Sequence, residues 1–75
     1  MRTIYSYRIK IVRSSPYDPV PSNKWICIGG EPYQDKVALI YEITVSELEV
    51  DEIEREINEL SQKVKVLEVE RVLVE

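Results

Sequence analysis

The chain has 75 residues, a formal net charge of −4, one cysteine and no histidine. A chain of this length predicts a single domain, residues 1–75, whose hydrophobic core is thin. One cysteine cannot form an internal disulfide, and the usual Cys/His zinc sites need more ligands than are present, so we expect neither a metal nor a cofactor. Self-association is the stabilising device that remains.

Charge and hydropathy also limit the classes of partner. Residues 1–36 carry six basic and three acidic side chains, whereas residues 37–75 carry four basic and eleven acidic ones. The acidic total argues against a protein that coats nucleic acid non-specifically, although the basic half leaves room for a local anionic contact. No apolar run approaches the ~20 residues of a membrane span, and no apolar signal-peptide block follows the first residues. We therefore expect a cytoplasmic protein without membrane contact. The excess of Glu over Asp, with few amides, is typical of thermophiles.

Residues 3–13 predict the first strand because apolar and polar side chains alternate along them. The tyrosines and β-branched residues suit a strand with one buried face. The predicted core face carries Tyr5, Tyr7, Ile9 and Ile11, and the opposite face carries Ser6, Arg8 and Lys10.

Residues 14–35 predict a long loop that contains one short strand. Three prolines between Pro16 and Pro21 forbid a helix and favour an extended path. Residues 24–28, KWICI, are β-prone and are followed by two glycines, so we expect a short strand there. The glycines predict a turn, and residues 31–35 then complete the loop.

Residues 36–45 predict the third strand, and the stretch 44–64 predicts the only helix. Five apolar residues recur at intervals of three and four and form a single stripe, whereas the remaining helix face is acidic or polar. Ser46 with Glu49 fits a capping box, and Asp51 with Glu54 is the alternative start. The stripe consists of Val50, Ile53, Ile57, Leu60 and Val64.

Residues 63–75 predict the last strand, with an imperfect alternation. The apolar residues change phase between Val66 and Leu67, and residues 72–74 are apolar on both faces. A β-bulge that resets the phase explains this pattern, and burial of both faces is the alternative.

The order strand, short strand, strand, helix, strand predicts an α+β fold with a small, mainly antiparallel sheet of three to four strands. One helix covers one face of this sheet. The return from helix to strand resembles half of a ferredoxin-like fold in topology.

Two features that suggest catalysis have simpler explanations. The carboxylates of the helix lie opposite its apolar stripe, so solvation or an acidic docking surface accounts for them better than acid–base chemistry, which needs burial. Cys27 stands between two isoleucines and no histidine exists to activate it, so we interpret it as a small core residue. We expect no enzymatic activity.

Aromatic and basic residues of the N-terminal half form the best candidate binding patch. Cations beside aromatic rings suit single-stranded nucleic acid or a protein contact, and packing of the long loop onto a thin core is the structural alternative. The patch comprises Arg8, Lys10, Arg13, Tyr17, Lys24, Trp25 and Tyr33.

The second sheet face carries apolar residues that a single helix cannot also cover. Either the proline-rich loop or a second copy must shield them, and the last strand is a further candidate for pairing with its twin. The candidate dimer face comprises Ile4, Val12, Ile40, Val72 and Val74.

These observations predict a small non-catalytic interaction or adaptor protein that forms a homodimer and docks onto another protein. The alternative is a nucleic-acid-binding module that uses the basic first strand and the Trp/Tyr loop.

Overall fold

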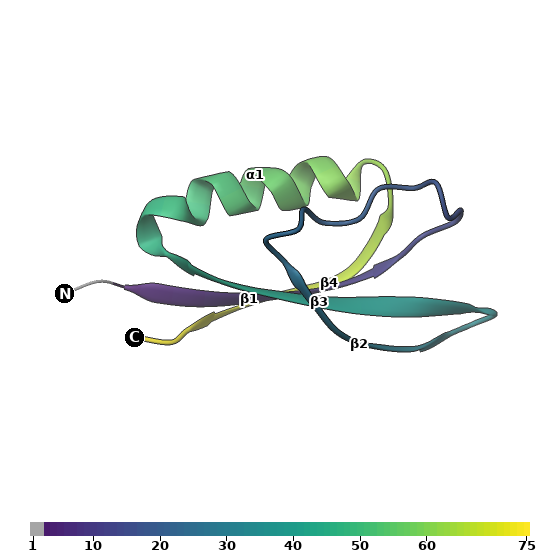
Figure 1. Ribbon diagram of the computed structural model, residues 1–75, viewed down its shortest axis with the longest axis horizontal. Helices are drawn as coiled ribbons and strands as arrows, with labels where there is room; N and C mark the ends of the chain where they lie inside the picture. Colours follow the sequence, from purple (N-terminus) through teal and green to yellow (C-terminus); the bar gives the residue numbers. More distant parts are fainter. Residues whose placement is uncertain (1–2) are drawn as a thin grey trace.

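The computed structural model describes residues 3–75. The strands are β1 (Ile4–Val12), β2 (Ile26–Tyr33), β3 (Lys36–Ser46) and β4 (Lys65–Leu73). A short 3-10 turn, η1 (Glu47–Glu49), leads into the helix α1 (Val50–Ser61). The α+β class and the β-β-β-α-β order predicted from the sequence are confirmed, and Figure 1 shows the single helix lying along one face of the sheet.

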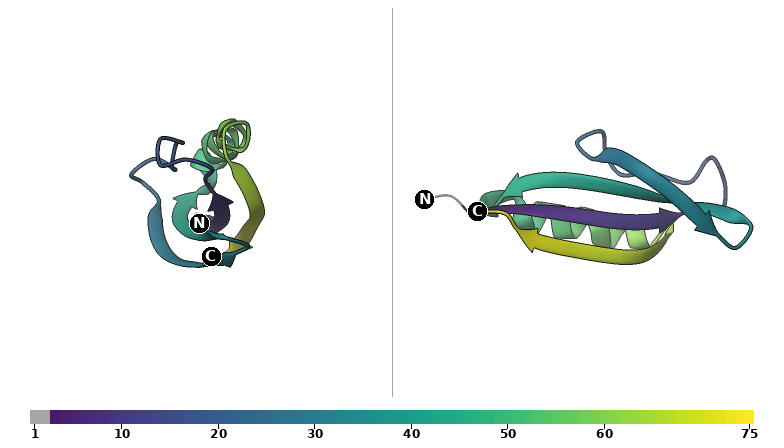
Figure 2. Two further views of the ribbon diagram at one scale, coloured as in Figure 1. Left: turned by 90° about the vertical axis from the view of Figure 1, so that its right-hand side faces the viewer. Right: turned by 90° about the horizontal axis from the view of Figure 1, so that it is seen from below.

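The four strands form one antiparallel sheet in the order β2-β3-β1-β4. β1 lies between β3 and β4 and is antiparallel to both, so β3 and β4 run parallel to each other. The connection from β3 through α1 to β4 therefore crosses over β1. This topology places β2 at one edge of the sheet and β4 at the other (Figure 2).

The core lies between α1 and the inner face of the sheet. The alternation predicted for β1 is confirmed, because Tyr7, Ile9 and Ile11 are its most completely buried side chains. The apolar stripe of α1 is also confirmed: Ile53, Leu60 and Val64 belong to the core cluster, and Val50 and Ile57 pack against it. β3 contributes Ile43 and Val45, and the long loop contributes Trp25.

The second strand is longer than the sequence predicted. β2 continues through Gly29, Gly30 and Pro32 and ends in a tight turn at Gln34 and Asp35, so the expectation of a turn at the glycines and a loop over 31–35 was wrong. Pairing with β3 organises these poor strand formers, and a register shift between Cys27 and Gly29 absorbs the irregularity. The resulting hairpin extends beyond the end of α1 (Figure 2).

The entry to the helix also differs from the prediction. Ser46 ends β3 and makes no side-chain hydrogen bond to a helical amide; its hydroxyl lies 3.4 Å from the carboxylate of Glu49. The capping box is therefore not formed, and Asp51 lies inside the helix. The amide of Glu47 instead donates to the carbonyl of Thr3, which ties the helix entry to the start of β1. Leu48, which falls off the apolar stripe, is 89% exposed.

The phase change in the last strand arises from a bulge, one of the two alternatives that the sequence left open. The register between β1 and β4 shifts between Lys10 and Ile11, which leaves Leu67 as the extra residue. After the bulge, Val69 and Leu73 share the helix-facing side with Ile9 and Tyr5. Most of β4 is exposed, so burial of both faces is not the explanation.

Candidate interaction surfaces

The second face of the sheet carries a belt of charge in its middle. Arg8 forms a 2.9 Å ion pair with Glu42, and Lys10 is paired with Glu31 and, at 3.5 Å, with Glu68. The hydrogen bond to Glu42 raises the pKa of Arg8, and the hydrogen bond to Glu31 raises the pKa of Lys10. Two of the four cations in the candidate binding patch, Arg8 and Lys10, are therefore already paired with carboxylates of this chain.

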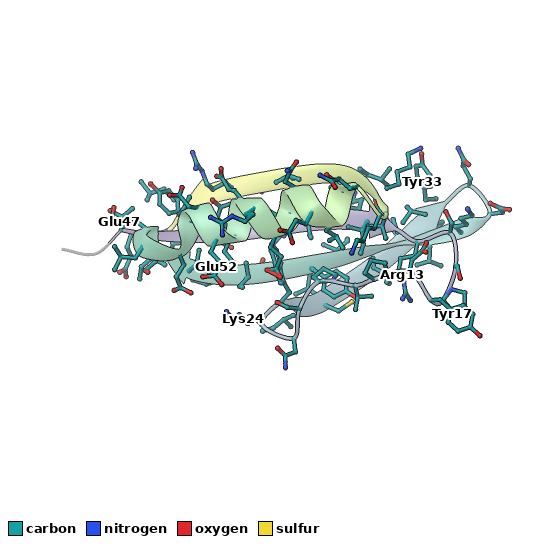
Figure 3. The ribbon with its side chains drawn as sticks, turned by 90° about the horizontal axis from the view of Figure 1, so that it is seen from above. Arg13, Tyr17, Lys24, Tyr33, Glu47 and Glu52 are labelled. Carbon is teal, nitrogen blue, oxygen red and sulfur yellow. The ribbon has the colours of Figure 1, made fainter. Side chains whose placement is uncertain are left out.

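The remaining members of the candidate binding patch lie elsewhere. Arg13 donates a 3.1 Å hydrogen bond to the carbonyl of Asp18 and so orders the loop that follows β1. Tyr17, which is 94% exposed, lies at the tip of this loop. Lys65 donates to the Tyr33 hydroxyl at 3.0 Å and lies over the ring. Figure 3 shows Arg13, Tyr17 and Tyr33 at one end of the molecule and Lys24 apart from them.

Trp25 and Lys24 contact the acidic side of α1. The indole Nε1 of Trp25 donates a 3.0 Å hydrogen bond to Glu56. The Lys24 ammonium lies 3.6 Å from Glu52, and both residues are labelled in Figure 3. Trp25 is only 5% exposed. Its structural role, packing the long loop over the core, is thus the one that the geometry supports. The patch is not one surface.

The five residues of the candidate dimer face are also separated. Val12 is buried by the chain's own residues, and Ile40 lines a hollow of about 220 Å³ with Ile28 and the charged belt. Ile4, Val72 and Val74 lie together at the other end of the sheet, because the Val74 amide donates to the carbonyl of Ile4 at 2.8 Å. Of these five residues, the three at this end of the sheet are therefore the ones that form an apolar cluster.

β4 presents an unpaired edge. The Glu47 amide donates to the carbonyl of Thr3, and the Val74 amide donates to the carbonyl of Ile4. The backbone N–H and C=O groups of odd-numbered β1 residues therefore point towards β3, and those of even-numbered residues point towards β4. Hydrogen-bonded pairs alternate along an antiparallel ladder. Glu68, Glu70 and Val72 therefore bond to β1, and the backbone groups of Val69, Arg71 and Leu73 point away from the sheet. Within residues 3–75 no strand covers them.

A groove of about 710 Å³ runs between this edge and the helix. Its apolar wall includes Ile57, Val66 and Val69. Its polar wall is a hydrogen-bonded group: the Tyr7 hydroxyl donates to Glu54 at 2.9 Å, and Arg71 donates to the same carboxylate oxygen at 3.2 Å. This group joins β1, α1 and β4.

Burial raises the pKa of the Tyr7 hydroxyl above its ordinary value of 10.0, and the neighbouring Glu54 carboxylate adds to the rise. Tyr7, Glu54, Val69 and Arg71 were not predicted from the sequence as site residues. The sequence holds one signal for this surface, which is the length of the last predicted strand. Its position at the edge of the sheet depends on a strand order that the sequence does not reveal.

The thiol and the helix carboxylates that were considered for catalysis make contacts within the fold. Cys27 is exposed rather than buried as expected, because it lies on the edge strand β2, and its Sγ is 3.6 Å from the carbonyl of Gly29. Three helix carboxylates bond to the chain's own side chains, as described for Glu52, Glu54 and Glu56. Across residues 3–75 no group of three or more acidic or thiol side chains is placed to hold a metal ion.

Comparisons with protein-family models, with curated proteins and with solved structures found no match. In the described part of the chain, α1 is too short and too polar to cross a membrane.

Proposed function

We propose that this chain is a small non-catalytic interaction protein of the cytoplasm, which forms a homodimer and docks onto another protein. The observation that carries the proposal is the apolar surface at the end of β4, where Val72, Leu73 and Val74 are 48%, 61% and 54% exposed. Contiguous exposed apolar residues on a small protein mark contact surfaces.

The size of the domain supports the same proposal. Only eleven hydrophobic residues are buried among residues 3–75, and a core of this size gives a marginal free energy of unfolding. Burying the exposed end of β4 against a partner adds apolar contact without a longer chain. The acidic surface of α1 is a second region that suits a basic partner protein.

Nucleic-acid binding has weaker support than protein contact. Binding to phosphates requires cations that exchange their counterions for the backbone of the nucleic acid. Arg8 and Lys10 instead lie in ion pairs with glutamates, and Trp25 is buried away from any stacking partner. We expect no binding to a single-stranded oligonucleotide at low salt. Binding at low salt that weakens steeply as salt is added would instead favour nucleic-acid recognition.

The proposal is tested by sedimentation equilibrium of the purified chain, combined with retention of partner proteins from native lysate. We expect a reversible monomer–dimer equilibrium and at least one retained protein. A chain that stays monomeric over the whole concentration range and retains no protein would contradict the proposal.

A further inference from the structure

We propose that the second copy binds by pairing β4 with β4 in antiparallel orientation, with the two-fold axis passing beside Val72. This inference rests on the proposed homodimer and names its surface. Two four-stranded sheets would join into one of eight strands. The occupant of the edge is a second copy because the end of β4 can pair with itself without placing like charges opposite each other.

β4 is the edge that is open to pairing. Sheet edges are protected by prolines, bulges and short strands. β2 has two of these features, a register shift between Cys27 and Gly29 and, near its end, Pro32, which has no amide to donate; its two glycines weaken the strand further. β4 is regular from Glu68 to Leu73, contains no proline, and leaves Val69, Arg71 and Leu73 with free backbone groups.

The charges of β4 select among the registers that a two-fold axis allows. In an antiparallel pair, two residues that lie directly opposite have their side chains on the same face of the sheet. The two-fold axis therefore passes beside one residue, which lies opposite the same residue of the second copy. An axis at Val69 places Glu68 opposite the partner's Glu70, and an axis at Glu70 places that glutamate opposite itself. An axis at Arg71 places two guanidinium groups opposite each other. Like charges directly opposite are destabilising.

The axis at Val72 avoids all of these pairs. An axis at Leu73 avoids them too, but it shortens the paired segment from residues 69–75 to residues 71–75. With the axis at Val72, this residue faces its own copy, Arg71 lies opposite the partner's Leu73, and Glu70 lies opposite the partner's Val74. The free backbone groups of Arg71 and Leu73 hydrogen-bond to each other across the interface, since both point outward from β4. All three exposed apolar residues of the strand end lie within the paired segment, Val72 and Val74 on the outer face and Leu73 on the helix-facing side.

The geometry of this dimer also determines where the two grooves lie. The axis is perpendicular to the sheet, so both copies of α1 lie on the same face and the two grooves beside β4 open towards each other. The contact involves only the end of each strand, which places it at or below ~1,200 Å² of buried surface. We therefore expect a weak, micromolar association.

Disulfide cross-linking tests the register. A pair that is not hydrogen-bonded in an antiparallel ladder has Cα atoms about 4.5 Å apart, within the range that a disulfide spans. In a Cys27→Ser background, Val72→Cys is expected to cross-link readily under mild oxidation at a concentration where the dimer forms. The matched control Glu70→Cys, on the same strand and face, is expected to remain monomeric on a non-reducing gel. Cross-linking of Glu70→Cys but not Val72→Cys would overturn the register.

Charge repulsion tests the surface independently of the disulfide. Val72→Lys places two ammonium groups opposite each other and is expected to weaken dimerisation at least about tenfold. Val37→Lys, on the hairpin strand β3 and similarly exposed, is the matched control and is expected to leave the dimer intact. Trp25 fluorescence verifies that each variant is folded. A dimer that withstands Val72→Lys uses another surface and overturns this inference while the proposed function stands. A wild-type chain that is always monomeric overturns this inference and the homodimer of the proposed function. If Val72→Lys leaves the dissociation constant of the dimer unchanged but weakens the binding of an added extended peptide, a foreign strand, and not a second copy, occupies the edge.

Discussion

The indole nitrogen of Trp25 lies 3.0 Å from a carboxylate oxygen of Glu56, and this hydrogen bond joins the long loop to the middle of α1. The loop before β2 has no regular structure of its own, so the buried ring is its main attachment to the core. The two residues are 31 positions apart in the chain, and the contact therefore depends on the complete fold.

Removing either side of this contact tests its contribution. We expect Trp25→Ala to lower the free energy of unfolding by about 3–5 kcal/mol, because it empties a core position. Glu56→Ala is expected to cost about 1 kcal/mol, since it leaves the indole N–H without its partner. Urea denaturation followed by circular dichroism measures both. Glu59→Ala, an exposed glutamate on the same helix, is the control, and an equal effect of the two glutamate substitutions would show that the hydrogen bond contributes nothing.

Tyr7 predicts a loss of stability at alkaline pH. Its folded-state pKa lies above the unfolded value of 10.0, because burial opposes ionisation. The stabilisation is fully present below pH 10.0 and is lost as the pH rises through the raised folded value. Burial raises the pKa of Tyr41 as well, so the two residues act in the same direction. We expect Tyr7→Phe to reduce the fall in stability above pH 10.0, measured by denaturation across pH.

Tyr17→Phe is the matched control for this prediction. Tyr17 is 94% exposed and contacts no core residue, so its substitution is expected to leave the alkaline profile of the wild type unchanged. If Tyr7→Phe and Tyr17→Phe gave the same profile, burial of the Tyr7 hydroxyl would not be the cause of the alkaline loss.

The two neighbouring glycines of β2 are expected to tolerate substitution differently. A Cβ at Gly30 would lie 3.2 Å from Val37 and 3.3 Å from the carbonyl oxygen of Ala38, whereas a Cβ at Gly29 would meet nothing within 4 Å. Gly30→Ala is therefore expected to destabilise by about 1 kcal/mol, through crowding against backbone. Gly29→Ala is expected to be neutral or to stabilise by about 0.5 kcal/mol, because it restricts the unfolded chain. Thermal unfolding of the pair measures the difference; the reverse order would contradict the strand assignment at β2.

Gln34 occupies a strained position in the turn between β2 and β3. Its φ of 55° lies in the left-handed region, which side chains other than Asn, Asp and Gly rarely adopt. We expect Gln34→Gly to raise the free energy of unfolding by about 0.5–1 kcal/mol, since glycine adopts this conformation without steric cost. Gln62→Gly, at the end of α1 with a φ of −80°, is expected to be destabilising instead. Destabilisation by both substitutions would argue against the left-handed turn.

The elements with a strict period could be predicted from the sequence, and the irregular ones could not. Two features were predicted correctly, namely the apolar stripe from Val50 to Val64 and the alternation in β1. Both arise because apolar side chains are buried away from water, so the local pattern and the tertiary packing agree. β2 was predicted too short because Gly29, Gly30 and Pro32 disfavour a strand locally. Only pairing with β3, a long-range interaction, makes them part of one.

The candidate surfaces depended still more on long-range register. The sequence placed Arg8 and Lys10 on one face, but it could not show that Glu42, Glu31 and Glu68 would lie beside them, because strand partners are set by the fold. The open edge also depends on the fold. β4 is the last strand in the order β2-β3-β1-β4, so within residues 3–75 no strand pairs with its outer side.

Amide hydrogen exchange at Arg71 and Leu73 tests the central claim, that β4 of one copy pairs with β4 of another. Both amides point away from β1, so they are unprotected in the monomer and hydrogen-bonded in the dimer. We expect their exchange to slow as the protein concentration rises through the dissociation constant, whereas the Glu70 amide, which bonds to β1, stays protected throughout. Exchange of Arg71 and Leu73 at the unprotected rate at every concentration would contradict the account.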